Sequence, residues 1–184
     1  MWLLIAQAIY LLMPAYFANM APVIAMRAGL LKGLAEPLDG GRKFSDGRAL
    51  FGSHKTYRGL VCAVLAGMLI ALIQSFLLRF AFFAPLSVLP YDFPFLIGFL
   101  LGLGAILGDL VKSFFKRRVN LASGRPWVPF DQIDFVLGAY VLLSLFYSAF
   151  LTASLFWTSL AVSFLLHVLT NHTAFWLGVR REKW

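Results

Sequence analysis

Four long stretches of this chain contain no Asp, Glu, Lys or Arg, and this segregation of charge limits the folds that the chain can adopt. They cover residues 1–26, 59–78, 93–108 and 135–179. A helix needs roughly 20 consecutive apolar residues to cross a bilayer. The first two stretches supply one span each, and the third reaches that length with its flanking residues. The last is long enough for two spans joined by a hairpin near residues 149–156. We therefore expect five transmembrane helices.

The composition favours an all-α integral membrane protein. Of the 184 residues, 61% are hydrophobic and only 13% are charged, which differs strongly from soluble domains. The sequence contains no recognisable internal repeat or soluble domain, so we expect one transmembrane domain over residues 1–184. A cleaved signal peptide at the N-terminus is disfavoured, because its basic residues would precede the apolar run, whereas here they follow it.

The basic residues lie between the spans and predict the orientation in the membrane. Residues 27–58 contain seven Lys and Arg, residues 112–125 contain five, and the C-terminal tail contains three. Such residues stay on the cytoplasmic side. We therefore expect a multi-pass protein of the cell membrane, with both polar segments and the C-terminus facing the cytoplasm and the N-terminus outside the cell. The net charge of +8 has two explanations, which are this bias alone or attraction to anionic lipid headgroups. We expect contact with the lipid bilayer but no nucleic-acid binding, since the cations are divided among short loops.

The second polar segment, residues 108–135, carries acids that suit a metal ion. Asp131 and Asp134 are three residues apart, so on a helix they share a face and can hold one divalent cation together. Asp109 lies at the end of an apolar helix, where a carboxylate is costly unless it is paired or bound to metal. The alternative for the later pair is that it precedes the next helix and caps its N-terminus.

Basic and glycine-rich residues near these acids indicate phosphate binding. The second segment contains the run Lys116, Arg117 and Arg118. The first segment combines cations with glycines, which let backbone amides turn around phosphate oxygens. Its candidate residues are Asp39, Gly40, Gly41, Arg42, Lys55 and Arg58. The alternative for the first segment is a solvated connector whose cations hold it at the membrane surface.

Two of the spans carry further patterns. The third contains Gly98, Gly102, Gly104 and Gly108, a small-residue spacing that predicts close packing inside the bundle or in a homodimer. In the last span His167 and Asn171 are four residues apart and share a face. Polar side chains within a span generally face the bundle interior. We therefore expect this pair either to line a site or to form a hydrogen bond between helices.

The polar motifs extend over nearly the whole chain in a characteristic order. They are NMAP (19–22), PLDGGR (37–42), DGR (46–48), GSHKTYRG (52–59), GD (108–109), SFFKRR (113–118), Gly124, PFDQID (129–134), His167, Asn171 and LGVR (177–180). In this order they resemble the CDP-archaeol synthase family, which is related to the CDP-diacylglycerol synthases, or phosphatidate cytidylyltransferases. Each motif is weak by itself, and their order over five spans is specific.

The resemblance implies an enzyme, a nucleotidyltransferase of phospholipid biosynthesis. In that family a membrane lipid phosphate attacks the α-phosphorus of CTP, giving a CDP-lipid and pyrophosphate. The substrates implied here are CTP and either an archaetidic-acid-type lipid phosphate or phosphatidic acid. The lipid tails would enter sideways between the helices.

The resemblance also implies roles for the candidate residues. Mg²⁺ would be held by the three acids Asp109, Asp131 and Asp134. The triphosphate would be neutralised by Lys116, Arg117 and Arg118. The rest of the binding site would comprise Asp39, Gly40, Gly41, Arg42, Lys55, Arg58, Gly124, His167 and Asn171.

Two other classes of membrane protein are alternatives to this enzyme. A small transporter or channel subunit predicts polar residues distributed through the spans, whereas here they cluster in the connecting segments. Another phospholipid-headgroup transferase, of the CDP-alcohol phosphotransferase type, requires an acid-rich motif that residues 39–42 do not continue.

Overall fold

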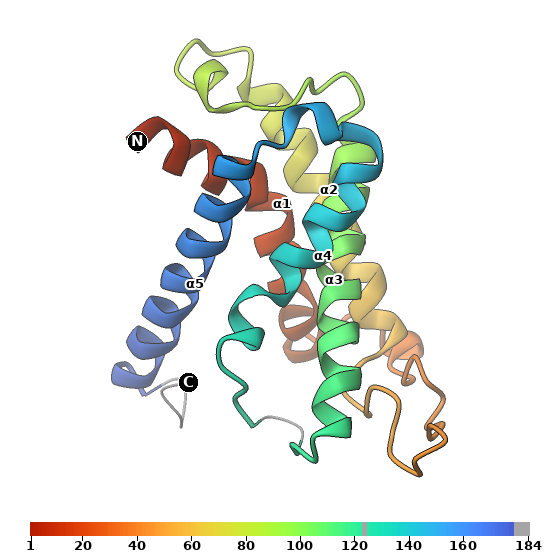
Figure 1. The fold of residues 1–184 in the computed structure, drawn as a ribbon. Helices are drawn as coiled ribbons and strands as arrows, with labels where there is room; N and C mark the ends of the chain where they lie inside the picture. The colour runs from red at the N-terminus through yellow and green to blue at the C-terminus, as the bar shows by residue number, and fades with distance from the viewer. Residues whose placement is uncertain (123–124, 179–184) are drawn as a thin grey trace.

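Five long helices traverse the molecule in alternating directions (Figure 1). A computed structural model describes residues 1–122 and 125–178. The helices are α1 (Trp2–Arg27), α2 (Tyr57–Leu77), α3 (Pro94–Arg118), α4 (Phe130–Tyr147) and α5 (Ala153–Trp176). Each is long and apolar enough to cross a membrane, which confirms the all-α fold with five candidate spans.

Both polar connections lie at one end of the bundle, which we call the loop end. Residues 28–56 join α1 to α2 there and include a short 3-10 helix, Lys32–Leu34, while residues 119–129 join α3 to α4. The opposite end holds the N-terminus and the 3-10 helices Ala84–Leu86 and Ser148–Phe150 (Figure 1). The last of these makes the hairpin that divides the final apolar stretch into two helices.

The second polar segment is more helical than the sequence suggested. α3 continues to Arg118, so much of the loop expected over residues 112–125 belongs to the helix. Its last turn carries three cations, which favour a helix C-terminus. Neither acid of α4 is its N-cap residue, which is Pro129, but Asp131 lies in the first turn, where a carboxylate favours the helix N-terminus.

Glycine contacts bring α3 against both of its neighbours. A Cβ on Gly104 would lie 2.5 Å from the carbonyl oxygen of Gly138 in α4, and one on Gly108 would collide with Asp134. A Cβ on Gly98 would lie 2.6 Å from the Gly67 oxygen in α2. Small residues allow such approach of helix backbones. The glycines of α3 therefore pack inside the chain, and they are no evidence for a homodimer.

A buried glutamine completes the hydrogen bonding of α1 around Pro14. Pro14 lies inside that helix and has no N–H to donate to the carbonyl of Tyr10. The side-chain amide of Gln74 in α2 donates to this carbonyl instead. In return the Tyr10 hydroxyl donates to the Gln74 backbone oxygen at 3.1 Å, and Tyr91 donates to the Gln74 side chain at 3.0 Å. The group that Pro14 leaves without a helical partner is thus satisfied by a neighbouring span.

Two hydroxyl pairs attach α5 at the edge of the bundle. Tyr16 of α1 and Ser163 lie 2.7 Å apart, as do Tyr140 of α4 and Ser159. Both serines are fully buried. These contacts fix the rotation of α5 about its axis, so that its polar residues near the loop end face the bundle.

Arg118 holds the first polar segment against the end of α3. Its guanidinium lies 3.8 Å from the ring centre of Phe114 and 4.7 Å from that of Phe44. It donates to the Ala49 carbonyl at 2.9 Å and pairs with Asp46 at 3.4 Å. This residue was expected to bind the triphosphate. In the structure its contacts join the loop to the helix, and we call Arg118 the clamp between them.

We predict that Gly104→Ala destabilises the protein by ~1–3 kcal/mol, because the added methyl group forces α3 away from α4. The matched control is Gly33→Ala, where a Cβ meets nothing within 4 Å. The measurement is the fraction of monodisperse protein left after heating in detergent. Equal thermal tolerance of the two variants would contradict the packing role.

We predict that Arg118→Lys loosens the first polar segment, since lysine keeps the charge but loses the planar donor fork and its stacking. Chymotrypsin cleavage at Phe44 should accelerate about tenfold, in proportion to the population of the open loop. Arg42→Lys, on the exposed part of the same loop, is the control. Identical cleavage rates for both variants would show that Arg118 is not the clamp.

Candidate functional site

One face of α3 and the first turns of α4 place five charged side chains together at the loop end. Asp109, Lys112 and Lys116 follow the i, i+3, i+7 spacing that aligns side chains along a helix. Asp131 and Asp134 occupy the first turns of α4, on the side that faces α3. The close glycine contact between the two helices brings these two sets of charges within reach of each other.

Lys112 lies at the centre of this cluster. Its Nζ is 3.0 Å from Asp109 Oδ1, 3.1 Å from Asp131 Oδ1 and 2.8 Å from Asp134 Oδ2. A protonated lysine has three N–H donors and no acceptor, so each carboxylate can take one donor. The ammonium therefore marks the point on which the three carboxylates converge.

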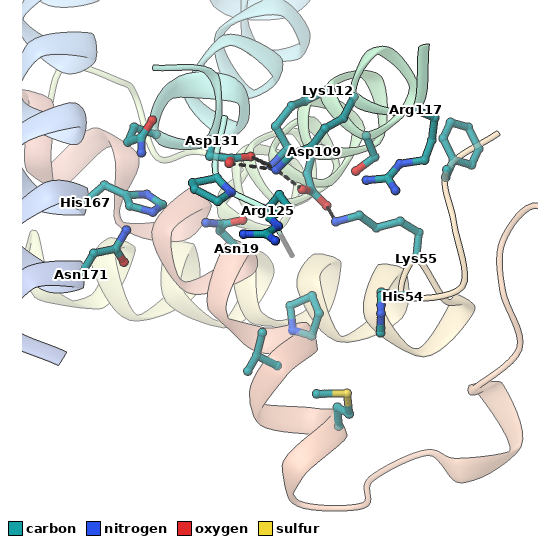
Figure 2. A pocket seen from close by; sticks show the side chains of 18 residues that line it. Asn19, His54, Lys55, Asp109, Lys112, Arg117, Arg125, Asp131, His167 and Asn171 are labelled. Carbon is teal, nitrogen blue, oxygen red and sulfur yellow. Dashed lines mark hydrogen bonds and ion pairs between the residues drawn. The ribbon is translucent and has the colours of Figure 1, made fainter. Parts of the chain in front are cut away.

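Two further lysines complete the network. Lys55, from the first polar segment, forms an ion pair with Asp109. Lys116 Nζ lies 3.0 and 2.9 Å from the two oxygens of Asp131, which also accepts a hydrogen bond of 2.6 Å from the Trp127 backbone. Figure 2 shows the ion pairs that run from Asp131 through Lys112 to Asp109 and Lys55. Three carboxylates thus share three ammonium groups.

A polar cavity of about 570 Å³ opens beside this cluster, between α1, α3, α4, α5 and the end of the first polar segment. Seven of the residues expected from the sequence line it: Lys55, Asp109, Lys116, Arg117, Asp131, His167 and Asn171. His167 and Asn171 reach it from α5, across from the charged cluster (Figure 2). The structure therefore unites residues from both polar segments and the last span in one cavity.

Asp39 was expected in the binding site but organises its own loop. Its carboxylate accepts backbone hydrogen bonds from Gly41 at 3.0 Å, Phe51 at 3.0 Å and Gly52 at 3.1 Å. Burial alone would raise the pKa of this carboxyl, but the three N–H donors together hold the pKa below its usual value. The carboxylate of Asp39 thus stabilises the fold of its own loop.

Other expected residues also lie outside the cavity. The described lining does not include Gly40, Gly41, Arg42, Arg58 or Arg118. Gly40 and Gly41 have φ angles of 55° and 74°, a left-handed backbone conformation that other residues rarely adopt, and they form a turn. Gly124 lies outside the described residues. The glycine-rich stretch is therefore a structural turn, and the expectation that it lines the site is not supported.

The sequence interpretation missed Lys112, although a signal for it exists. Lys112 lies three residues after Asp109 and four before Lys116, so continuing the helix past Gly108 would have placed all three on one face. The expectation of a loop hid this pattern. Other cavity residues not chosen from the sequence include Asn19, His54, Ser113, Arg125 and Gln132.

An apolar groove of about 680 Å³ lies on the other side of the cluster, between α3 and α4. Most of its lining is aliphatic or aromatic, including Val111, Phe115 and Leu137. Lys112 and Asp134 are its charged members, and Lys112 also lines the polar cavity. A cation-rich cavity and an apolar groove thus meet at the same lysine, an arrangement suited to an amphiphile with an anionic head.

Comparison with known proteins agrees with this geometry. The model of the CarS-like CDP-archaeol synthase family matches residues 1–184. The CDP-archaeol synthase of Methanoregula boonei is 38% identical, over 94% of this chain and 100% of its own. That of Methanocaldococcus jannaschii is 35% identical, over 98% of both chains.

A solved structure is similar as well. It is described as an intramembrane enzyme for archaeal membrane lipid biosynthesis, and it is 34% identical to this chain. The two superpose with a TM-score of 0.64 over 89% of this chain and 92% of the other. The family match over the full length, together with these relatives, establishes that this chain belongs to the CDP-archaeol synthase family.

Proposed function

We propose that this protein catalyses the CTP-dependent formation of CDP-archaeol from an archaeal lipid phosphate. The observation that carries this conclusion is the full-length family match, supported by a cation-rich cavity that meets an apolar groove. A phosphate oxygen of the lipid attacks the α-phosphorus of CTP. The bond from that phosphorus to the β-phosphate oxygen breaks, and pyrophosphate leaves. Membership in this family favours an isoprenoid ether lipid over phosphatidic acid.

The cations of the cavity suit this reaction. Phosphoryl-group transfer depends mainly on positioning and on neutralising negative charge. Lys55, Lys116 and Arg117 line the cavity from two different segments of the chain, so they can surround a triphosphate. Their role is to bind CTP, to draw charge away from the α-phosphorus and to stabilise the departing pyrophosphate. His167 and Asn171 would bound the site from α5.

The three carboxylates fit a magnesium ion. Mg²⁺ prefers carboxylate oxygens, and Asp109, Asp131 and Asp134 converge on one cationic group. Within the described residues, no three His, Cys, Asp or Glu side chains form a ready-made metal cluster. In this structure the three acids surround the ammonium of Lys112. When bound, Mg²⁺ would offset the charge of the triphosphate. The carboxylates would hold it and keep its position fixed.

The apolar groove between α3 and α4 suits the lipid chains. Its lining is almost entirely hydrophobic, and its charged residues are Lys112 and Asp134. A lipid chain lying there would present its phosphate to the cluster without leaving the bilayer. With the loop end in the cytoplasm, as the cation distribution predicts, CTP would enter from the aqueous side and the lipid from the membrane.

A channel or transporter is the weaker candidate. Leu11 of α1, Leu101 of α3 and Leu143 of α4 are essentially fully buried, and the polar cavity is confined to the loop end. The direct test uses purified protein with CTP, Mg²⁺ and a panel of ether-linked and ester-linked lipid phosphates. Formation of a CDP-lipid and pyrophosphate supports the proposal, and absence of both with every lipid would refute it.

We predict that Asp134→Asn lowers CDP-lipid formation by about 100-fold or more, because the neutral amide no longer serves as a metal ligand. The near-isosteric change should leave the protein folded and inserted. Asp92→Asn, at an exposed position of the opposite end, is the control. Near-wild-type turnover of Asp134→Asn would remove this residue from the metal site.

We predict that Lys116→Ala raises the KM for CTP by about tenfold, as expected for the loss of one charge-assisted hydrogen bond. The KM for the lipid phosphate should change much less. Arg42→Ala, whose side chain lies outside the cavity, is the control. An unchanged dependence of the rate on CTP would exclude Lys116 from nucleotide binding.

A further inference from the structure

We propose that Lys112 is a built-in counter-ion which a divalent cation displaces, and that the freed ammonium then binds the triphosphate. This inference rests on the proposed function, because it takes Asp109, Asp131 and Asp134 as the metal ligands. It goes beyond that function by assigning to Lys112 two successive positions in one binding event.

The geometry makes the two cations mutually exclusive. Lys112 Nζ lies within 3.1 Å of an oxygen from each of the three carboxylates. A magnesium ion binds carboxylate oxygens at about 2.0–2.1 Å, so an ion that used all three acids would lie where the ammonium now lies. The lysine must therefore leave before these carboxylates can coordinate the metal together.

The three acids differ in what remains when Lys112 leaves. Asp109 keeps its ion pair with Lys55, and Asp131 keeps the two contacts with Lys116. Asp134 is buried, and among the described residues Lys112 is the one cation paired with its carboxylate. A buried carboxylate without a counter-ion is strongly unfavourable. Departure of the lysine is therefore coupled to arrival of another cation at Asp134.

The surroundings of Lys112 allow this exchange. Lysine has a long, flexible stem, and Lys112 borders the polar cavity beside the cluster. Turning into that cavity would carry its ammonium toward the space proposed for CTP. The three carboxylates and the three lysines balance in charge. A divalent cation taken up by the acids leaves the cluster positive, which favours the anionic triphosphate.

The test is the binding of Mn²⁺, a paramagnetic substitute for Mg²⁺, measured by electron paramagnetic resonance without nucleotide or lipid. Lys112→Met removes the competing charge at nearly constant length, so Mn²⁺ should bind about tenfold more tightly than to the wild type. Lys112→Arg keeps a permanent charge with a larger donor fork and should bind Mn²⁺ more weakly than the wild type. This order of affinities is the signature of displacement.

Two controls locate the effect. Lys116→Met removes a neighbouring lysine that pairs with Asp131 alone, so it should change Mn²⁺ affinity far less than Lys112→Met. Adding Asp134→Asn to Lys112→Met should abolish the gain, because the ion then loses a ligand. If the gain persists in this double variant, the ion binds elsewhere and the proposal fails.

A measurement on the wild type keeps the proposal testable if Lys112→Met does not fold. Mg²⁺ alone should increase the labelling of Lys112 by an amine-reactive reagent, read by mass spectrometry, and leave Lys116 unchanged. Equal labelling with and without Mg²⁺ would overturn the proposal. If the wild type makes CDP-lipid with Mg²⁺ but Lys112→Met shows no gain in Mn²⁺ affinity, the displacement of Lys112 is wrong and the proposed function stands. If CDP-lipid forms without any divalent cation, the metal assignment itself falls.

Discussion

The charge cluster between α3 and α4 is the interaction on which the functional end of the molecule depends. Three carboxylates and three ammonium groups near a bilayer are tolerable only because each finds a partner of opposite sign. Lys112 pairs with one oxygen of each acid, on the part of α3 that continues past its last apolar turn. The same pairing joins the two helices to the first polar segment through Lys55.

Close packing of the backbones makes that cluster geometrically accessible. Gly104 and Gly108 of α3 leave no room for a side chain against α4, so Asp109 and Asp134 can reach the same ammonium. The charge pairing at the end of the bundle thus depends on the close packing of α3 against α4. The polar cavity lies on one side of this contact and the apolar groove lies on the other. The cavity suits the phosphates of the nucleotide, and the groove suits the chains of the lipid.

Much of this architecture could be predicted from the sequence, because a bilayer imposes strong rules. Apolar length predicts five spans and the final hairpin. The structure has five helices long and apolar enough to span a membrane, and it has the hairpin. The spacing of Asp131 and Asp134 correctly placed them on one side of a helix. Asp39 and Arg118 show what local sequence leaves out, because both have contacts within the protein that their spacing does not reveal. Each charge looked available for a ligand, but one accepts backbone amides and the other clamps a loop.

The sequence by itself determined the number of spans, the gathering of both polar segments at one end, and the type of chemistry that its acids and cations suit. These follow from composition and order along the chain. Only the tertiary structure decided which charges face one another. Lys112 became central because α4 places two carboxylates opposite it, a relation across helices that no local spacing encodes. For the same reason, only the fold distinguished the cations that line the cavity, such as Lys116, from Arg118, which holds the first polar segment against α3.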